Sequence, residues 1–233
     1  MAPRSYHAPE DLPASVPVFP LGGVLLLPRG ELPLNIFEPR YLDMIDAALG
    51  GDRLIGMVQP KIGDQPSATT EDDDEPSGDD TPELMRVGGL GRISAFQETN
   101  DGRYLITLTG LCRFRVLEEL DTTTLFRQCR VSASEFGVDF KAHAGEDQVD
   151  RDKLLETFRA YLDANDLKAD WSSVTRAPTE ALVNGLAMMS PFGAREKQAL
   201  LEAKDLNERA DILVAMTEMS LLRADEDDSS TLQ

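Results

Sequence analysis

The side chains most often used in catalysis or metal binding are sparse in this chain. Histidine occurs at His7 and His143, and cysteine at Cys112 and Cys129. Neither histidine has a Cys, Asp or His partner at the spacing of a zinc site, so we expect both to be exposed and uninvolved. The cysteines fall in separate predicted strands, where buried small side chains are a better interpretation than a redox pair. The sequence therefore predicts no metal site and no cofactor.

Two further patterns would support ATP hydrolysis or peptide cleavage, and neither is complete. The motif G-x-x-x-x-G-K-[ST] does not occur, and Gly88, Gly89 and Gly91 lie in a strand pattern without the phosphate-binding lysine. Ser67, with Lys61 upstream, superficially resembles a Ser-Lys peptidase pair. It lies in a low-complexity tract that cannot hold a nucleophile and a base in register. We therefore expect no enzymatic activity and name no catalytic residue.

The charge of the chain is negative and concentrated. There are 42 acidic and 23 basic side chains, which gives a net charge of −19. Thirteen of the acids lie in two stretches without a base, 64–83 and 225–228, and without them the net charge is −6. This balance argues against nucleic acid and anionic membranes as partners, because both attract basic patches. The acid run also lacks the ligand spacing and closing Glu of an EF-hand, which favours a solvated loop.

The start of the chain, M-A-P-R-S-Y-H, has no apolar signal core, and the longest apolar run is far below membrane-spanning length. Two cysteines are too few for a disulfide scaffold. We therefore expect a cytoplasmic protein without a membrane partner.

The elements that would position any site begin with a stretch rich in glycine and proline. Its three short apolar runs read as strands, and they lie at 16–21, 24–27 and 32–37. The prolines remove ladder donors, so we expect these strands at edges, starts or bulges. A helix is predicted over 39–49, where Pro39 suits the first helical position and Gly50 ends the apolar repeat.

Alternating patterns predict further strands, at 54–58, 84–97, 104–109, 112–116 and 125–133. Within 112–116 the alternation places Phe114 on the inner face and Arg113 in solvent. From about residue 146 the apolar period becomes helical, and a capping box of Asp205 and Glu208 starts the last predicted helix. Strands followed by helices indicate an α+β chain with segregated elements.

The same sequence resembles the Lon substrate-binding domain, which is the amino-terminal domain of Lon proteases and also occurs in cereblon and in small stand-alone proteins. The resembling pieces are V-F-P-L at 18–21, L-L-P at 26–28, L-P-L-N-I-F-E-P-R-Y at 32–41, Met44, Val87-Gly88, Gly91-Arg92-Ile93 and G-L-C-R-F-R-V at 110–116. Their order and spacing are more specific than any single piece. The resemblance covers about residues 15 to 222. It implies a PUA-like, mostly antiparallel β-domain followed by a helical subdomain, in a stand-alone member without ATPase or protease domains.

Composition and resemblance together give the expected organisation. We expect a flexible arm, a β-domain, a helical subdomain and a disordered acidic tail, at 1–14, 15–143, 144–223 and 224–233. The β-domain would be interrupted at 61–82 by a disordered acidic loop, because that tract has too few apolar residues to offset the entropy of ordering it.

The resemblance implies a non-catalytic module that recognises an unfolded protein or an apolar peptide. Such a module would act as an adaptor in protein quality control, beside a protease or a chaperone, or as a free-standing binder. The alternative is a PUA-like RNA-binding module, which the acidic balance disfavours.

The candidate binding residues flank the first turn and the strand-to-helix junction: Phe19, Leu21, Phe37, Glu38, Arg40 and Tyr41. The apolar four would be exposed anchors, since aromatic side chains carry much of the energy of protein interfaces. Glu38 and Arg40 have two interpretations. They form the polar rim of the surface, or Glu38 satisfies the helix amides while Arg40 braces the loop.

Overall fold

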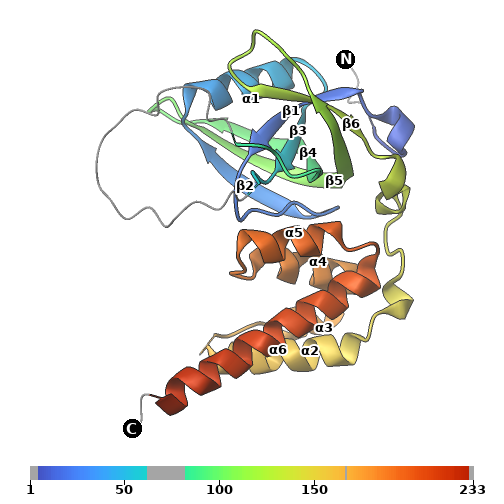
Figure 1. Cartoon of the computed structure of the whole chain (residues 1–233), viewed down its shortest axis with the longest axis vertical. Coiled ribbons are helices and arrows are strands. Elements are labelled where there is room, and N and C mark those ends of the chain that lie inside the picture. Colours follow the sequence, from blue (N-terminus) through green and yellow to red (C-terminus); the bar gives the residue numbers. More distant parts are fainter. Residues whose placement is uncertain (1–4, 62–81, 166, 231–233) are drawn as a thin grey trace.

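In the computed structural model, which describes residues 5–61, 82–165 and 167–230, a β-rich half lies above a helical half (Figure 1). The first contains β1 (Ser15–Pro20), β2 (Glu31–Ile36), α1 (Pro39–Gly50), β3 (Leu54–Val58), β4 (Val87–Glu98), β5 (Tyr104–Glu119) and β6 (Arg127–Ser132). The second contains α2 (Arg151–Ala164), α3 (Trp171–Arg176), α4 (Thr179–Met189), α5 (Ala194–Glu202) and α6 (Leu206–Ser230). Two short 3-10 helices, η2 (Ser134–Phe140) and η3 (Glu146–Gln148), connect the halves. The predicted α+β class with segregated elements is confirmed.

The strands close into a barrel. Their order is β2-β5-β4-β3-β1-β6, and β6 pairs back with β5. One edge of the long strand β5 pairs with two strands in turn, because residues 104–109 pair with β2 and residues 115–119 pair with β6. Only β1 and β3 run parallel among the described pairs. Closure removes the free edges of five strands and leaves β2 as an outer strand on β5.

The prolines of β1 sit where the strand has a neighbour on one side. β1 pairs with β6 through residues 15–18 and with β3 through residues 18–20. Pro17 therefore faces a partner only in β6, and Pro20 only in β3. Each proline therefore lies where β1 has a partner strand on one side only, and its missing N–H costs no ladder hydrogen bond on the open side. The prolines thus have the edge character that was predicted, although β1 as a whole lies between two strands.

The strand predicted at 24–27 is wrong. Leu25, Leu26 and Leu27 are buried but form no ladder, and the run crosses the barrel close to Gly89 and Gly110. The residues that follow bond to the barrel directly, since the Arg29 amide donates to the Gly110 carbonyl and the Gly110 amide to the Gly30 carbonyl, both at 2.8 Å. The segment therefore lies between the two halves and contributes side chains to the cores of both.

The two ends of the chain are more ordered than expected. Tyr6, in the predicted flexible arm, is buried in the barrel core and its hydroxyl donates to the Asp52 carbonyl at 3.1 Å. At the other end, α6 continues to Ser230, through most of the segment predicted as a disordered tail. Of the predicted acidic loop, residues 62–81 lie outside the described ranges, as do residues 1–4 of the arm.

Phe114 points into the barrel as predicted, but the solvent position predicted for Arg113 is wrong. Arg113 is only 1% exposed, because the outer face of this strand is covered by the helical half. Its Nε and Nη2 donate to the two carboxylate oxygens of Asp139, each at 2.9 Å. Its Nη1 donates to the carbonyl oxygens of Leu201 and Ala203 at the end of α5. One guanidinium thus joins β5, η2 and α5.

We predict that Arg113→Ala lowers the free energy of unfolding by about 3 to 5 kcal/mol, because it leaves the Asp139 carboxylate buried without its partner. Arg115→Ala is the control, since Arg115 pairs with Glu135 at the surface, and it should cost little. Urea denaturation followed by circular dichroism measures both. Similar losses for the two variants would contradict the assignment.

A second prediction concerns the close approach at Gly110, where an added Cβ would lie 2.0 Å from the Leu27 carbonyl oxygen. Gly110→Ala should lower the free energy of unfolding by about 3 kcal/mol, since the crossing segment must shift. Gly185→Ala is the matched control in α4, where an added methyl would meet nothing within 4 Å. It should stabilise by up to about 1 kcal/mol. A neutral Gly110→Ala in the same urea titration would show that the crossing is loose.

Candidate binding surface

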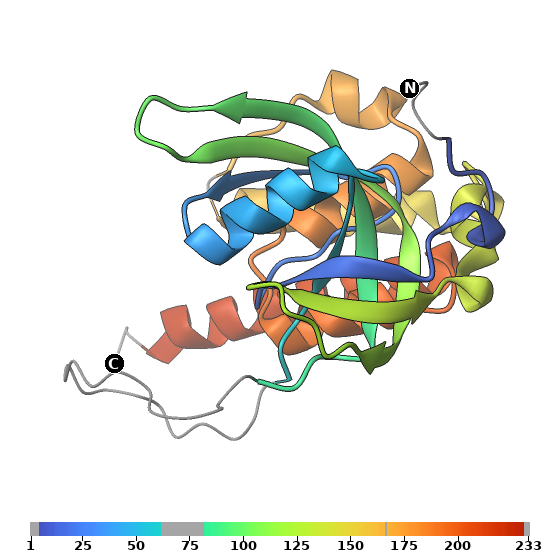
Figure 2. The ribbon, with the colours of Figure 1, turned by 90° about the horizontal axis from the view of Figure 1, so that it is seen from above.

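The structure does not expose all the predicted anchors. Phe19 and Tyr41 are 8% and 7% exposed, and their rings lie 4.2 Å apart in the core under α1. The expectation that both are exposed is wrong, because α1 turns back across the barrel directly after β2 and carries Tyr41 onto β1 (Figure 2). Burial raises the pKa of the Tyr41 hydroxyl. These two rings belong to the fold rather than to an open surface.

Glu38 and Arg40 pair with each other at the surface. Arg40 donates from Nε and Nη2 to Glu38 Oε2, at 3.0 and 2.7 Å. Glu38 occupies the N-cap position of α1 but its side chain accepts no hydrogen bond from the helix amides. The arginine also lies 4.6 Å above the Tyr41 ring. The cap that we considered for Glu38 is therefore not formed, and the contacts of Arg40 are to its neighbours Glu38 and Tyr41. Leu21 is half-buried against the same core.

Phe37 is the one predicted aromatic anchor that is open to solvent, and two further apolar side chains, Phe96 and Leu105, are exposed in the same part of the barrel. The exposed fractions are 62% for Phe37, 43% for Phe96 and 42% for Leu105. We call these three side chains the hairpin patch, since they surround the free end of the β4–β5 hairpin and the end of β2. The hairpin projects beyond the helical half (Figure 2).

The ladder register explains how the hairpin patch is arranged. Leu105 pairs with Asn35, two residues before Phe37, so Leu105 and Phe37 share a face. Phe96 pairs with Ile106 and lies on the opposite face, where its ring contacts Tyr104 at 4.9 Å. Apolar side chains are thus exposed on both faces of the sheet near the end of the hairpin, Leu105 and Phe37 on one face beside β2 and Phe96 on the other face in β4. The exposure of Leu105 could have been predicted from the sequence, because Leu105 is an apolar residue on the face of its strand that otherwise carries polar side chains.

A groove begins near the start of α1 and continues to the C-terminus of α5. It consists of three adjoining hollows of about 180, 320 and 550 Å³. The first is lined by Tyr41 and Leu125, and it shares Pro60 with the second. The second shares Lys61 and Met85 with the third, which ends at the C-terminus of α5. We call this feature the α5 groove.

The α5 groove holds more bases than acids, which the net charge of the chain does not reveal. Most of this basic charge is neutralised locally, because acidic neighbours form ion pairs with Arg40, Lys61, Arg115 and Arg127. A surface of paired charges attracts an anionic polymer weakly.

The structure places both cysteines in the core of the barrel and His143 beside an acidic side chain. Cys112 and Cys129 are free and buried, and burial raises their pKa values to about 12 and about 11, so both stay protonated at neutral pH. His143 was expected to be uninvolved, but its Nδ1 lies 3.1 Å from Glu146 Oε2. Within the described ranges, no group of three His, Cys, Asp or Glu side chains could hold a metal ion. No helix in those ranges is both long and apolar enough to cross a membrane.

Comparison with known proteins gives one consistent result. The family described as the ATP-dependent protease La (LON) substrate-binding domain matches residues 15–218. The Lon protease of Dictyoglomus thermophilum is 25% identical over 222 residues, which are 90% of this chain and 25% of that protein. The Lon protease of Escherichia coli K12 is 26% identical over 211 residues, 88% of this chain and 25% of that protein. The chain thus spans about a quarter of the length of these relatives.

Two solved structures share the fold. The Lon N-terminal domain protein of Xanthomonas campestris superposes with a TM-score of 0.58 at 22% identity, over 86% of this chain and 97% of that one. The N-terminal domain of the Mycobacterium avium complex Lon protease gives 0.61 at 17% identity, over 88% and 98%. At these identities the likeness shows the fold alone.

We predict that Tyr41 and Phe37 respond differently to truncation. Tyr41→Ala should lower the free energy of unfolding by about 3 kcal/mol or more, because it leaves a cavity beside Phe19. Phe37→Ala should stay within about 0.5 kcal/mol of the parent, since the ring is in solvent. Urea denaturation compares the two, and a large loss for Phe37→Ala would place that ring in the core.

Proposed function

The chain belongs to the Lon substrate-binding domain family, and we propose that it recognises unfolded or loosely structured polypeptide through the hairpin patch and the outer strand β2. The single observation that carries this proposal is the exposure of Phe37 and Leu105 at the end of β2, a strand that pairs on one side only, with Phe96 exposed one strand further in. Apolar side chains in water are costly unless a partner covers them.

An extended peptide suits this surface on physical grounds. The outer edge of β2 offers backbone donors and acceptors to an added strand, while the exposed side chains on both faces supply apolar contacts. Pro33 within β2 lacks an N–H, so this position offers no backbone donor to any added strand, whether a peptide or a second copy of the chain. Binding by a few apolar side chains and a short ladder should be weak, with a Kd of roughly micromolar.

We further propose that the module works as an adaptor. As an adaptor it would present a captured polypeptide to a protease or a chaperone in the cytoplasm, and its match to the substrate-binding domain of Lon proteases supports this role. The two cysteine thiols are buried and protonated at neutral pH, so neither supplies a thiolate nucleophile.

The test is a fluorescence-anisotropy titration of a labelled apolar peptide and of a labelled single-stranded RNA at low and high salt. We expect peptide binding that persists at high salt, because apolar contact is not screened as phosphate contacts are. Phe37→Ala and Leu105→Ala should each weaken it by at least about fivefold, the effect of losing 1 kcal/mol.

Leu222→Ala is the matched control, since Leu222 is an exposed leucine on α6, 64% accessible and outside the hairpin patch. It should leave the peptide affinity unchanged, and circular dichroism checks that all three variants stay folded. Tight, salt-sensitive RNA binding without peptide binding would overturn the proposal in favour of an RNA-binding module.

A further inference from the structure

The pairing of β2 with β5 shows which backbone groups of β2 are already used. The Gly110 amide donates to the Gly30 carbonyl at 2.8 Å, just before β2 begins. The antiparallel register then continues through β2 without a shift. Hydrogen-bonded and non-hydrogen-bonded pairs alternate in such a ladder. Because Gly30 bonds to β5, the residues that follow at every second position do so as well, and these are Leu32, Leu34 and Ile36.

The backbone N–H and C=O groups of the intervening residues, Glu31, Pro33 and Asn35, therefore point away from β5. All three residues are exposed, and β2 has no second partner among the described strands. Pro33 agrees with this alternation, since a proline is tolerated in a strand where its missing N–H would face solvent. The outer edge of β2 thus offers amide donors at Glu31 and Asn35, and carbonyl acceptors at all three residues.

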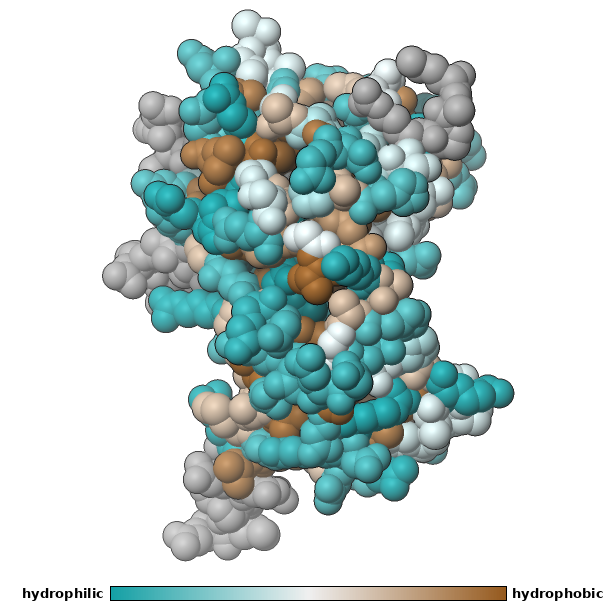
Figure 3. All heavy atoms as spheres, turned by 90° about the vertical axis from the view of Figure 1, so that its right-hand side faces the viewer, coloured by the Kyte–Doolittle hydropathy of each residue, from teal (hydrophilic) through white to brown (hydrophobic). Residues whose placement is uncertain are grey.

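A strand added to this edge would meet apolar side chains on both faces of the sheet. Its residue opposite Asn35 would lie on the face of Phe37 and Leu105, which are exposed. The neighbours of that residue would lie on the other face, beside the half-buried Leu32 and Leu34. By contrast, the helical half is largely hydrophilic on the side of the connecting segment (Figure 3). A segment that is apolar on both faces therefore finds more contact at β2 than there.

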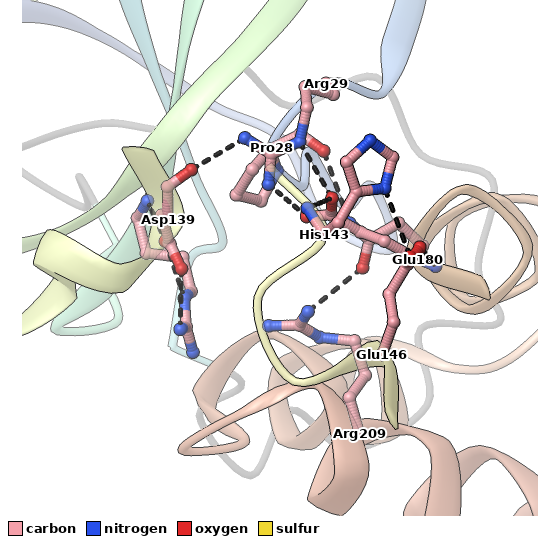
Figure 4. A network of polar contacts seen from close by, with 9 residues as sticks. Pro28, Arg29, Asp139, His143, Glu146, Glu180 and Arg209 are labelled. Carbon is pink, nitrogen blue, oxygen red and sulfur yellow. Dashed lines mark hydrogen bonds and ion pairs between the residues drawn. The ribbon is translucent and has the colours of Figure 1, made fainter. Parts of the chain in front are cut away.

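The start of β2 is held in place by residues of the connecting segment and of α4. Arg29, two residues before the strand, donates from Nη1 to the Asp139 carbonyl at 2.7 Å and from Nε to Glu180 at 3.1 Å (Figure 4). The Pro28 carbonyl accepts from Asn184 Nδ2 at 3.2 Å. These bonds fix the backbone directly before β2. An edge that is already ordered loses little conformational entropy when a strand binds to it.

We propose, on the basis of the proposed function, that a bound polypeptide adds to β2 as an antiparallel strand paired with Glu31, Pro33 and Asn35. Antiparallel pairing is the slightly more stable kind. The substrate class is then a continuous apolar segment of the kind that forms a strand buried on both faces in a folded protein, and such a segment is accessible only when that protein is unfolded.

The register also sets a rule for proline in the substrate. The substrate residues opposite Glu31, Pro33 and Asn35 each donate an N–H to a carbonyl of β2, so proline is excluded at these three positions. The N–H groups of the residues between them point away from β2, and proline is allowed there.

The first test uses the full chain and a labelled peptide with a run of Leu and Val residues between Gly-Ser flanks. Asn35→Pro removes the outward amide, and Asn35→Ala is the matched control that removes only the side chain. Asn35→Pro should weaken binding in an anisotropy titration by at least about fivefold, as expected for a lost hydrogen bond, and Asn35→Ala should bind as the parent does. Pro33→Ala adds an outward donor and should tighten binding by about threefold. Circular dichroism checks the fold of each variant, and equal affinities for all of them would overturn the paired edge.

The peptide provides the complementary test. Methylation of one backbone amide at a time should lower the affinity at every second residue of the paired run and leave it unchanged between them. A second peptide, with Ser at every other apolar position, should bind at least about threefold more weakly. Equal binding of the two peptides would contradict the substrate class.

Amide hydrogen exchange measured by NMR decides even if Asn35→Pro fails to fold. In the free protein the amides of Leu32 and Leu34 should exchange slowly and those of Glu31 and Asn35 fast, and saturation with peptide should slow the latter two. If these two amides stay fast in the complex while Phe37→Ala still weakens binding, the paired edge is wrong and recognition by the hairpin patch stands. Absence of peptide binding by the parent would instead contradict the proposed function, and the paired edge with it.

Discussion

One buried ion pair fixes how the helical half sits on the barrel. Arg113 projects from β5 toward Asp139 in η2, and the same guanidinium takes up the last carbonyl groups of α5. A helix end buried against a sheet would otherwise leave those carbonyls without donors. The ion pair therefore determines where the helices lie on the barrel more than it stabilises them. The cavities between the two halves take their shape from that placement.

The sequence predicted well wherever one local pattern decided the outcome. Alternation predicted strand structure in both parts of β5 and the inward Phe114, although it divided this single strand in two at Gly110. The cap at Asp205 predicted the start of α6. It predicted poorly where a distant segment covers a face. Arg113 looked like a surface residue because the alternation of a strand cannot say what lies on its second face. The run at 24–27 has the composition of a strand, but the close approach of its backbone to Gly89 and Gly110 depends on the assembled barrel.

The same distinction between local patterns and distant contacts applies to the candidate site residues. Phe37 could be found from sequence, because it stands at a strand end among turn-formers. Tyr41 has the same local character, yet the direction of α1 turns it inward onto Phe19. The burial of Arg209 had no local signal at all, since this residue lies within a helical repeat and contacts α4 and α5 only in the folded chain. Sites assembled across a seam between halves need the tertiary structure to be seen.

The placement of β1 has a consequence for synthesis of the chain. Ser15 pairs with Arg130, 115 positions later, and a ribosome adding about 5 to 20 residues per second needs roughly 6 to 23 s to cover that distance. During this interval β1 has an apolar face and no β6 to close against, which invites pairing with the same segment of a neighbouring nascent chain. Pro17 and Pro20 withhold the amides that such pairing would use. These two prolines, which add no hydrogen bond to the finished barrel, thus limit pairing of β1 with other chains until β6 has been made.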